Sequence, residues 1–196
     1  MPAIFSKEIK SELYHRMIEV GWQLLVGEGI AAVRVERVAR SVGIAKGTFY
    51  SFFSSKGDFV YAMLMENRQR GVDELERARA RAGRALTRAE LGQWLVRVWG
   101  SERNIFRIFT YDEYARLVRS FPEGRSLAPA GDGALVRWIA TEIVALEHPV
   151  DVREVENLNR VLALTLLNRR RLHPEVLERT VAALQEDVLD ALFGEA

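Results

Sequence analysis

Residues 29–56 read Gly-Ile-Ala-Ala-Val-Arg-Val-Glu-Arg-Val-Ala-Arg-Ser-Val-Gly-Ile-Ala-Lys-Gly-Thr-Phe-Tyr-Ser-Phe-Phe-Ser-Ser-Lys. The pattern predicts two short helices here, at about 35–42 and 46–52. Helices of this length are not stable alone in water, so the two must pack together as one unit. Ala39 is small where a second helix has to cross closely, and Gly43 suits the left-handed conformation that ends a helix. This is the layout of a helix-turn-helix, whose second helix can lie in the major groove of DNA.

The second of these helices is short and rich in polar groups. Lys46, Thr48, Tyr50 and Ser51 follow one another closely, and Gly47 lets another backbone approach. Hydroxyl groups and free N–H groups at a helix start bind phosphates, and the helix dipole adds to the attraction. Considered one at a time, each residue has a purely structural alternative: Tyr50 could lie at the edge of the hydrophobic core, and Lys46 could be an ordinary solvated surface residue. Together these residues favour contact with DNA.

Positive charge is concentrated in the same part of the chain. The whole protein has a net charge of +1, but residues 1–56 contain eight Lys and Arg against five Glu, which gives +3. The remaining 140 residues contain 20 basic and 22 acidic side chains, which gives −2. Lys56 stands at a predicted helix start, where it opposes the dipole unless an anion compensates it. An uneven distribution of this kind steers the basic part towards DNA.

With these motifs, residues 14–62 resemble the DNA-binding domain of TetR-type (TetR/AcrR-like) transcriptional regulators. The resemblance covers about a quarter of the chain, and residues 63–196 fit that family only in the number and length of their helices. The most specific block is Gly-Thr-Phe-Tyr-x-x-Phe-x-x-Lys, with its spacing intact. The matching elements are Gly29-Ile30, Val38-Ala39, Gly43-Ile44, Gly47-Thr48-Phe49-Tyr50, Phe52-Phe53 and Ser55-Lys56.

The resemblance implies a dimeric, ligand-responsive regulator with a DNA-binding domain at 1–56 and a helical ligand-binding and dimerisation domain at 57–196. It implies a repressor that binds a palindromic double-stranded operator and is released by a small apolar or aromatic effector. By position, Thr48, Tyr50 and Lys56 would hold phosphates. The expected contacts to base edges or sugars come from Ala45, Lys46, Gly47, Ser51 and Phe52, and the start of the preceding helix adds Arg34 and Val35.

Two positions depart from the family pattern. The family usually has Ser or Thr as the N-cap where Arg34 stands, and often a Ser where Ala45 stands. Losing a cap commonly costs ~1 kcal/mol. Arg34 instead offers a cationic arm towards the DNA backbone or a guanine edge. Glu36 is negative on the expected DNA side, which argues against a base contact there. We therefore expect Arg34 and Lys46 to set much of the operator preference.

The rest of the chain also predicts helices only, so the expected fold class is all-α. Apolar residues recur at three- and four-residue spacing, and strand signals are absent. One irregular stretch, at 122–133, is rich in proline and glycine. Helices are expected at about 7–26, 55–83, 87–98, 103–120, 134–147, 152–171 and 175–193.

Aromatic residues at helical spacing mark a candidate effector site in the C-terminal part. The default interpretation of each is core packing, but several carry a polar group suited to lining a cleft. Nearby polar residues that could orient a ligand include Asn104, Asp112, Glu113 and Glu142. The candidate ligand-binding residues are Trp94, Trp99, Phe106, Phe109, Tyr111, Tyr114 and Trp138.

The last two predicted helices are apolar on more than one face. Such a helix must bury more than one face, either inside the protomer or against a symmetry mate. Both alternatives stay open, and the second gives an isologous four-helix contact in a homodimer. The candidate interface residues are Val155, Leu158, Leu162, Leu166, Leu177, Val181, Leu184 and Val188.

Composition excludes several other classes of function. The chain has no cysteine and only three scattered histidines, so we expect no metal site, no catalytic residues and no cofactor. No run approaches the ~18 apolar residues of a membrane span, and charge appears too early for a signal peptide, so a cytoplasmic protein without a membrane partner is expected. The rival interpretations are a helical small-molecule carrier with a merely structural helix-turn-helix and, further off, a cofactor-free lyase or isomerase.

Overall fold

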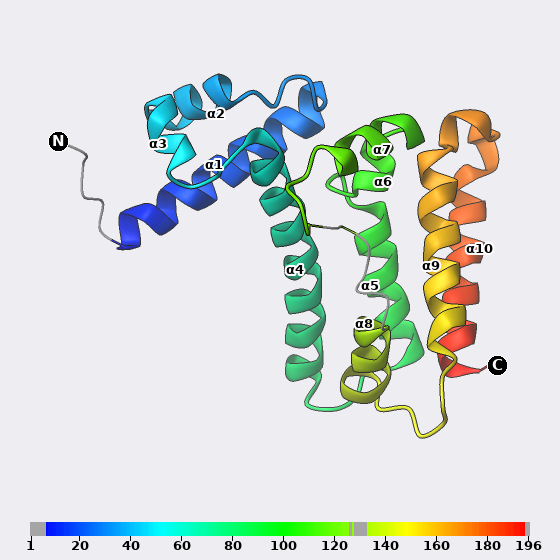
Figure 1. Cartoon of the computed structure of the whole chain (residues 1–196). Helices are drawn as coiled ribbons and strands as arrows, with labels where there is room; N and C mark the ends of the chain where they lie inside the picture. The colour runs from blue at the N-terminus through cyan, green and yellow to red at the C-terminus, as the bar shows by residue number, and fades with distance from the viewer. Residues whose placement is uncertain (1–6, 126, 128–132, 195–196) are drawn as a thin grey trace. The chain divides into compact units, whose positions relative to one another are not determined.

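The computed structural model describes residues 7–125, 127 and 133–194, and every regular element in these ranges is helical. The expected all-α class is thereby confirmed. The chain divides into two units, one made of the residues up to Asn67 together with Ser120–Arg125, and the other of Arg68–Arg119 and the residues from 126 onward. The elements are α1 (Lys7–Glu28), α2 (Val35–Val42), α3 (Lys46–Tyr50), α4 (Lys56–Ala82), α5 (Arg88–Gly100), α6 (Ile105–Ile108), α7 (Tyr111–Arg119), α8 (Ala134–Trp138), the π-helix η1 (Ile139–Ile143), α9 (Val152–Leu167), the 3₁₀-helix η2 (Arg169–Arg171) and α10 (Pro174–Phe193) (Figure 1).

The N-terminal unit is built on the two short helices that the sequence predicts. α2 has the predicted bounds, and its apolar residues at three- and four-residue spacing are buried. It ends because Gly43 adopts a left-handed conformation (φ 76°), from which its N–H donates to the carbonyls of Ala39 and Arg40. α3 follows after a short turn and buries Phe49 completely. The helix-turn-helix is therefore confirmed in structure.

The start of α4 is fixed by side-chain hydrogen bonds. The backbone N–H of Asp58 donates to the Ser55 hydroxyl (3.0 Å), and both the N–H and the hydroxyl of Ser54 donate to the Asp58 carboxylate (2.9 and 3.0 Å). These bonds satisfy backbone donors that a helix start leaves without an intrahelical partner. The helix begins at Lys56, as the Ser-x-x-Asp pattern predicts.

A distant segment, Ser120–Arg125, completes the N-terminal unit. Phe121 packs edge-on against Tyr61 with ring centroids 5.4 Å apart, and the guanidinium of Arg125 lies 4.9 Å from the same Tyr61 ring. Gly57 permits this approach, because a Cβ at that position would overlap the carbonyl oxygen of Ser120. The structural division therefore differs from the predicted boundary at residue 56, since α4 continues to Asn67 within this unit and a later segment joins it.

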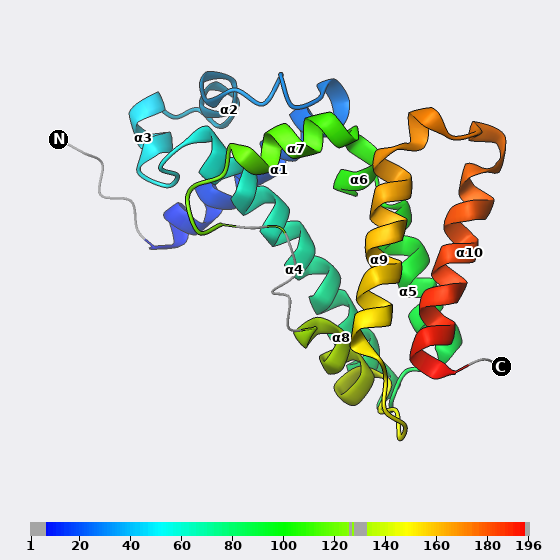
Figure 2. The same cartoon turned by 45° about the vertical axis from the view of Figure 1, so that its right-hand side comes forward.

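The C-terminal unit packs its long helices around one apolar core. α9 and α10 lie side by side, and α10 also contacts α5 (Figures 1 and 2). The predicted capping box at the start of α5 forms, since Glu90 and Thr87 exchange side-chain to backbone hydrogen bonds. The core includes Leu75, Leu91, Ile143, Leu162 and Leu166, each at most 1 % exposed.

Three predicted helices differ from those in the structure. The stretch 103–120 is broken at Phe109, whose backbone is extended, and α7 restarts with Thr110 and Glu113 exchanging cap hydrogen bonds. The stretch 134–147 becomes α8 and η1, which ends at Ile143, and Ala145 just beyond it has a positive φ of 50°. The α9 pattern ends at Leu167 and passes into η2. Of the predicted irregular stretch 122–133, residues 126 and 128–132 lie outside the described residues.

Candidate nucleic-acid interface

The outer face of α3 is open and rests on a rigid apolar base. Phe49 is fully buried, and its ring lies 5.3 Å from Phe53 and 5.2 Å from Phe59. On the opposite side Tyr50 is 45 % exposed, and a Cβ added at Gly47 would have nothing within 4 Å. Buried aromatic packing thus fixes the orientation of a five-residue helix whose other face is free for a large partner.

Lys46, the first residue of α3, forms an ion pair with Glu36 of α2. The ammonium lies 2.5 Å from the Glu36 carboxylate and 6.0 Å from the centre of the Tyr50 ring. The hydrogen bond and the charge of Glu36 raise the pKa of Lys46, and the hydrogen bond from Lys46 lowers the pKa of Glu36. Both side chains are more than half exposed, so the pair lies at the surface.

Two neighbouring cations, Arg34 and Lys56, are hydrogen-bonded to the loop before α2. Arg34 Nε donates to the carbonyl of Ala31 (3.2 Å), and Lys56 Nζ donates to the carbonyl of Ile30 (3.3 Å). Burial lowers the pKa of Lys56, and the nearby charge of Arg34 lowers it further. These hydrogen bonds end on neutral carbonyls, and among carboxylates the charge of Arg34 acts on Glu36, whose pKa it helps to lower. An anion placed here would relieve the repulsion between the two cations.

The comparisons with known proteins agree with this geometry. Residues 17–63 match the family described as bacterial regulatory proteins, tetR family. The N-terminal domain belongs to the TetR family. No curated protein sequence matches the chain.

The whole chain shares its fold with solved regulators. A TetR transcriptional regulator from Rhodococcus sp. RHA1 is 21% identical with a TM-score of 0.53, covering 92% of this chain and 97% of that one. FadR from Bacillus subtilis, solved in complex with stearoyl-CoA, is 17% identical with a TM-score of 0.54, covering 93% and 100%. The fatty acid degradation regulator FadR from Bacillus halodurans is 18% identical with a TM-score of 0.57, covering 93% and 95%. At these identities the likeness shows a common fold: an N-terminal helix-turn-helix and a C-terminal helical domain.

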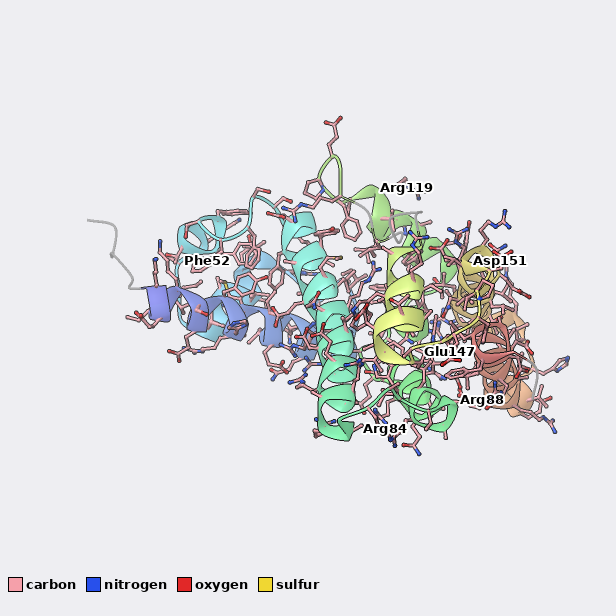
Figure 3. The ribbon with its side chains drawn as sticks, turned by 90° about the horizontal axis from the view of Figure 1, so that it is seen from below. Phe52, Arg84, Arg88, Arg119, Glu147 and Asp151 are labelled. Atoms are coloured by element: carbon pink, nitrogen blue, oxygen red, sulfur yellow. The ribbon has the colours of Figure 1, made fainter. Side chains whose placement is uncertain are left out.

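Within the TetR-family domain, most of the expected DNA-binding residues lie at the surface, and one does not. Val35 is only 7 % exposed and packs in the core of the domain, so its side chain does not lie at the surface where the DNA contacts are expected. Thr48 and Phe52 are partly buried, and the Phe52 ring lies 6.3 Å from that of Phe53 (Figure 3). Arg34 is the N-cap residue of α2 and makes no side-chain cap bond, as the departure from the family pattern predicts. The expected residues that are exposed are Arg34, Ala45, Lys46, Gly47, Tyr50, Ser51 and Lys56.

Sequence reasoning missed the carboxylate partners around the helix-turn-helix. Besides Glu36 with Lys46, Glu28 accepts two hydrogen bonds from Arg37, at 2.7 and 2.5 Å. The charge signs were visible in the sequence. The pairings were not, because separations of nine and ten residues across a turn have no helical periodicity.

The candidate effector residues of the C-terminal domain fall into different environments. Trp99 stacks on Phe106 and Phe106 packs against Tyr114, each with ring centroids 5.7 Å apart, so these three form one cluster. Burial raises the pKa of Tyr114. Trp94 donates its indole N–H to the carbonyl of Gly71 (2.9 Å) and is buried. The remaining three are Phe109, which is buried, Trp138, which packs against the core, and Tyr111, which is half exposed.

A pocket of about 240 Å³ lies where the start of α7 meets the end of α9. Among the candidate effector residues, it is lined by Tyr111. Its other lining residues are mainly polar or charged, and they are Thr110, Asp112, Leu167, Asn168, Arg170 and Arg171. This pocket therefore lacks the apolar lining expected for an aromatic effector.

The candidate dimer residues lie mainly inside the protomer. Five of them are at most 3 % exposed and therefore cannot reach a partner: Val155, Leu162, Leu166, Val181 and Val188. Leu158, Leu177 and Leu184 are half-buried. The exposed apolar side chains of α9 are instead Val161 and Leu164, at 46 % and 47 %. Apolar spacing identified the helices correctly but could not say which stripe faces inward.

Within residues 7–125, 127 and 133–194, His, Asp and Glu side chains do not gather in a group of three or more that could hold a metal ion. In the same ranges, the helices are not both long enough and apolar enough to cross a membrane.

Proposed function

We propose that this transcriptional regulator is a dimeric repressor that binds a palindromic operator and is released by a small effector in its C-terminal domain. One observation carries the DNA-binding part of the proposal. Arg34 at the start of α2 and Lys56 at the start of α4 are two neighbouring cations whose hydrogen bonds end on carbonyls. A regulator of this kind acts in the cytoplasm on chromosomal DNA and is not an enzyme.

A DNA phosphate would place negative charge between these two cations. Arg34 and Lys56 are held close enough for Arg34 to lower the pKa of Lys56, which opposes protonation of the lysine. A phosphate between them would favour both charged forms. Tyr50 and the backbone at Gly47 lie on the exposed side of α3, where hydroxyl and N–H groups can bind the adjacent backbone.

Binding to the promoter upstream of the protein's own gene tests the proposal. The operator-specific and non-specific affinities are measured by fluorescence anisotropy, with a promoter duplex and an unrelated duplex. Arg34→Ala should lower specific binding more than binding to unrelated DNA. Arg153→Ala is the matched control, because this exposed arginine pairs with Asp151 at the start of α9 in the other unit and its loss removes the same charge (Figure 3). Equal losses on both duplexes would make Arg34 a phosphate contact only.

The effector site is proposed at the cluster of Trp99, Phe106 and Tyr114. Stacked aromatic rings with a phenol at one edge suit a largely apolar or aromatic ligand. Because one structural neighbour was solved with stearoyl-CoA, the ligand panel should include long-chain acyl-CoA beside simple aromatic compounds. An effector should raise the melting temperature of the wild-type protein and not that of Phe106→Ala. It should also weaken DNA binding, since only a ligand with different affinities for the two states can shift their populations.

The dimer interface is proposed on the exposed side of α9 and α10. Val161 and Leu164 lie one turn apart on α9, and isolated protomers would leave both in water. Leu164→Glu should convert a dimer to a monomer in sedimentation experiments, whereas Val96→Glu, at another exposed valine, should not. A dimer must hold its recognition helices about 34–36 Å apart to reach successive major grooves.

The alternative function is a small-molecule carrier whose helix-turn-helix only supports the fold. The neighbouring cations at Arg34 and Lys56 disfavour this alternative, because a pair of like charges at the surface suits an anionic partner better than a purely structural role. A protein that binds effectors and shows no salt-dependent DNA binding would be such a carrier.

A further inference from the structure

Glu36 places a carboxylate on the surface that should meet DNA. It is the second residue of α2, is more than half exposed and accepts a hydrogen bond from Lys46, the first residue of α3. DNA phosphates repel a carboxylate, so Glu36 weakens non-specific binding and partly neutralises Lys46. Both effects weaken DNA binding, so a favourable contact of Glu36 with the operator is needed to offset them.

The base edges in the major groove offer such a partner. A carboxylate accepts hydrogen bonds from the N4 amino group of cytosine, and lysine donates preferentially to O6 and N7 of guanine. A single G·C pair presents both groups next to each other. Because the Glu36 carboxylate and the Lys46 ammonium are 2.5 Å apart, they present an acceptor and a donor side by side.

The other ion pair of the domain provides an internal contrast. Arg37 and Glu28 are similarly exposed and similarly close, at 2.5 Å, but neither residue belongs to α3. Both pairs carry no net charge. If neutralising a surface cation were the whole role of Glu36, removing either glutamate would affect DNA binding in the same way.

We propose that Glu36 and Lys46 act together to select one G·C base pair in each operator half-site. This inference rests on the proposed function, because it requires α3 to enter the major groove. Glu36 accepts from cytosine N4 while Lys46 donates to the guanine of the same pair. Guanine or thymine in place of the cytosine leaves the carboxylate facing an acceptor oxygen, and this repulsion rejects those bases. Adenine offers its N6 amino group to Glu36, but its partner thymine gives Lys46 only O4 where guanine gives O6 and N7, so the lysine disfavours this pair.

Selection from a library of random duplexes tests the inference without knowledge of the operator. The wild-type protein should enrich a palindromic motif with a G·C pair at one symmetric position in each half-site. Glu36→Gln and Lys46→Met should each reduce the preference at that position by about tenfold and leave the other positions unchanged. Glu28→Gln, the matched control, should enrich the wild-type motif. Circular dichroism confirms that each variant is folded, which the exposure of these side chains favours.

The outcomes separate this inference from the function on which it rests. If the wild-type protein enriches a motif and Glu36→Gln enriches the same one, Glu36 does not read DNA and the inference is overturned. A uniform gain in affinity for all sequences with Glu36→Gln overturns it as well, because the glutamate then acts by charge alone. If the wild-type protein enriches no motif and binds no DNA, the proposed function fails, and the inference with it.

Discussion

The guanidinium of Arg125 lies 3.0 Å from the carboxylate of Asp58. Asp58 also receives the hydrogen bonds of Ser54, in the turn between α3 and α4. The segment that follows α7 along the chain is therefore bound to the same carboxylate that orders the turn after α3. This contact makes residues 120–125 part of the structural support of the DNA-binding domain.

Replacing the two partners should destabilise the N-terminal unit unequally. Asp58 is 9 % exposed and serves both the helix start and Arg125, so Asp58→Ala should cost about 1–2 kcal/mol. Arg125 is about half exposed, so Arg125→Ala should cost less than about 1 kcal/mol. Urea unfolding and hydrogen exchange at the first turn of α4 measure both effects. Equal losses would show that the ion pair, not the helix cap, dominates.

Two glycines of α4 should respond in opposite ways to alanine. Alanine in a helix is normally favoured over glycine by about 1 kcal/mol. Gly71→Ala should follow this rule, since the new methyl group would meet only Val98, at 3.8 Å. Gly57→Ala should instead destabilise the protein, because its methyl group would displace the carbonyl of Ser120. Thermal denaturation compares the two variants, and a gain for both would contradict the docking of residues 120–125.

The sequence predicted the fold most accurately where local signals act alone. The bounds of α2, the left-handed Gly43 and the starts of α4 and α5 each depend on a few neighbouring residues. The break between α6 and α7 was missed although the cap formed by Thr110 and Glu113 could have signalled it. The return of residues 120–125 to the N-terminal unit was not predictable, because it depends on contacts between segments that are distant in the chain.

For the candidate site, the sequence predicted which residues are exposed better than how they are arranged. Lys46, Tyr50 and Lys56 are exposed as expected, whereas Val35 is buried because α2 uses it as part of its apolar stripe. From the sequence alone, the negative charge of Glu36 argues against a base contact. Its ion pair with Lys46 is visible only in three dimensions. Buried and exposed stripes on α9 have the same spacing, so only the structure separates Leu162 from Val161.

Backbone strain after η1 predicts a stabilising substitution. Ala145 has a φ of 50°, a left-handed conformation that costs a residue with a Cβ roughly 1–2 kcal/mol. Ala145 is exposed, so losing its methyl group removes little packing. Ala145→Gly should therefore raise the melting temperature, by a free energy below about 1 kcal/mol once the greater freedom of glycine in the unfolded chain is included. A lower melting temperature would show that this conformation is not strained.

The cap of α5 should make stability depend on pH in the acid range. Glu90 has a pKa lowered from 4.5 to about 2. The largest cause is the pair of hydrogen bonds from Arg84 (Figure 3), and the backbone N–H and hydroxyl of Thr87 lower the pKa further. A carboxylate with a lowered pKa stabilises the fold above pH 4.5, and this contribution is lost as the pH falls towards 2. Glu90→Gln should melt below the wild-type protein at neutral pH, and the gap should close between those pH values. A gap that stays constant would contradict a role for the charged form.

The most direct test of the central claim is the salt dependence of DNA binding. The affinity of the wild-type protein, Lys56→Met and Arg153→Ala for the promoter duplex is measured over a range of salt concentrations. The wild-type affinity should fall linearly on logarithmic axes. Lys56→Met should reduce the slope by about one, as expected when one phosphate contact is lost, and Arg153→Ala should leave it unchanged. Wild-type affinity that is absent or insensitive to salt would contradict the account.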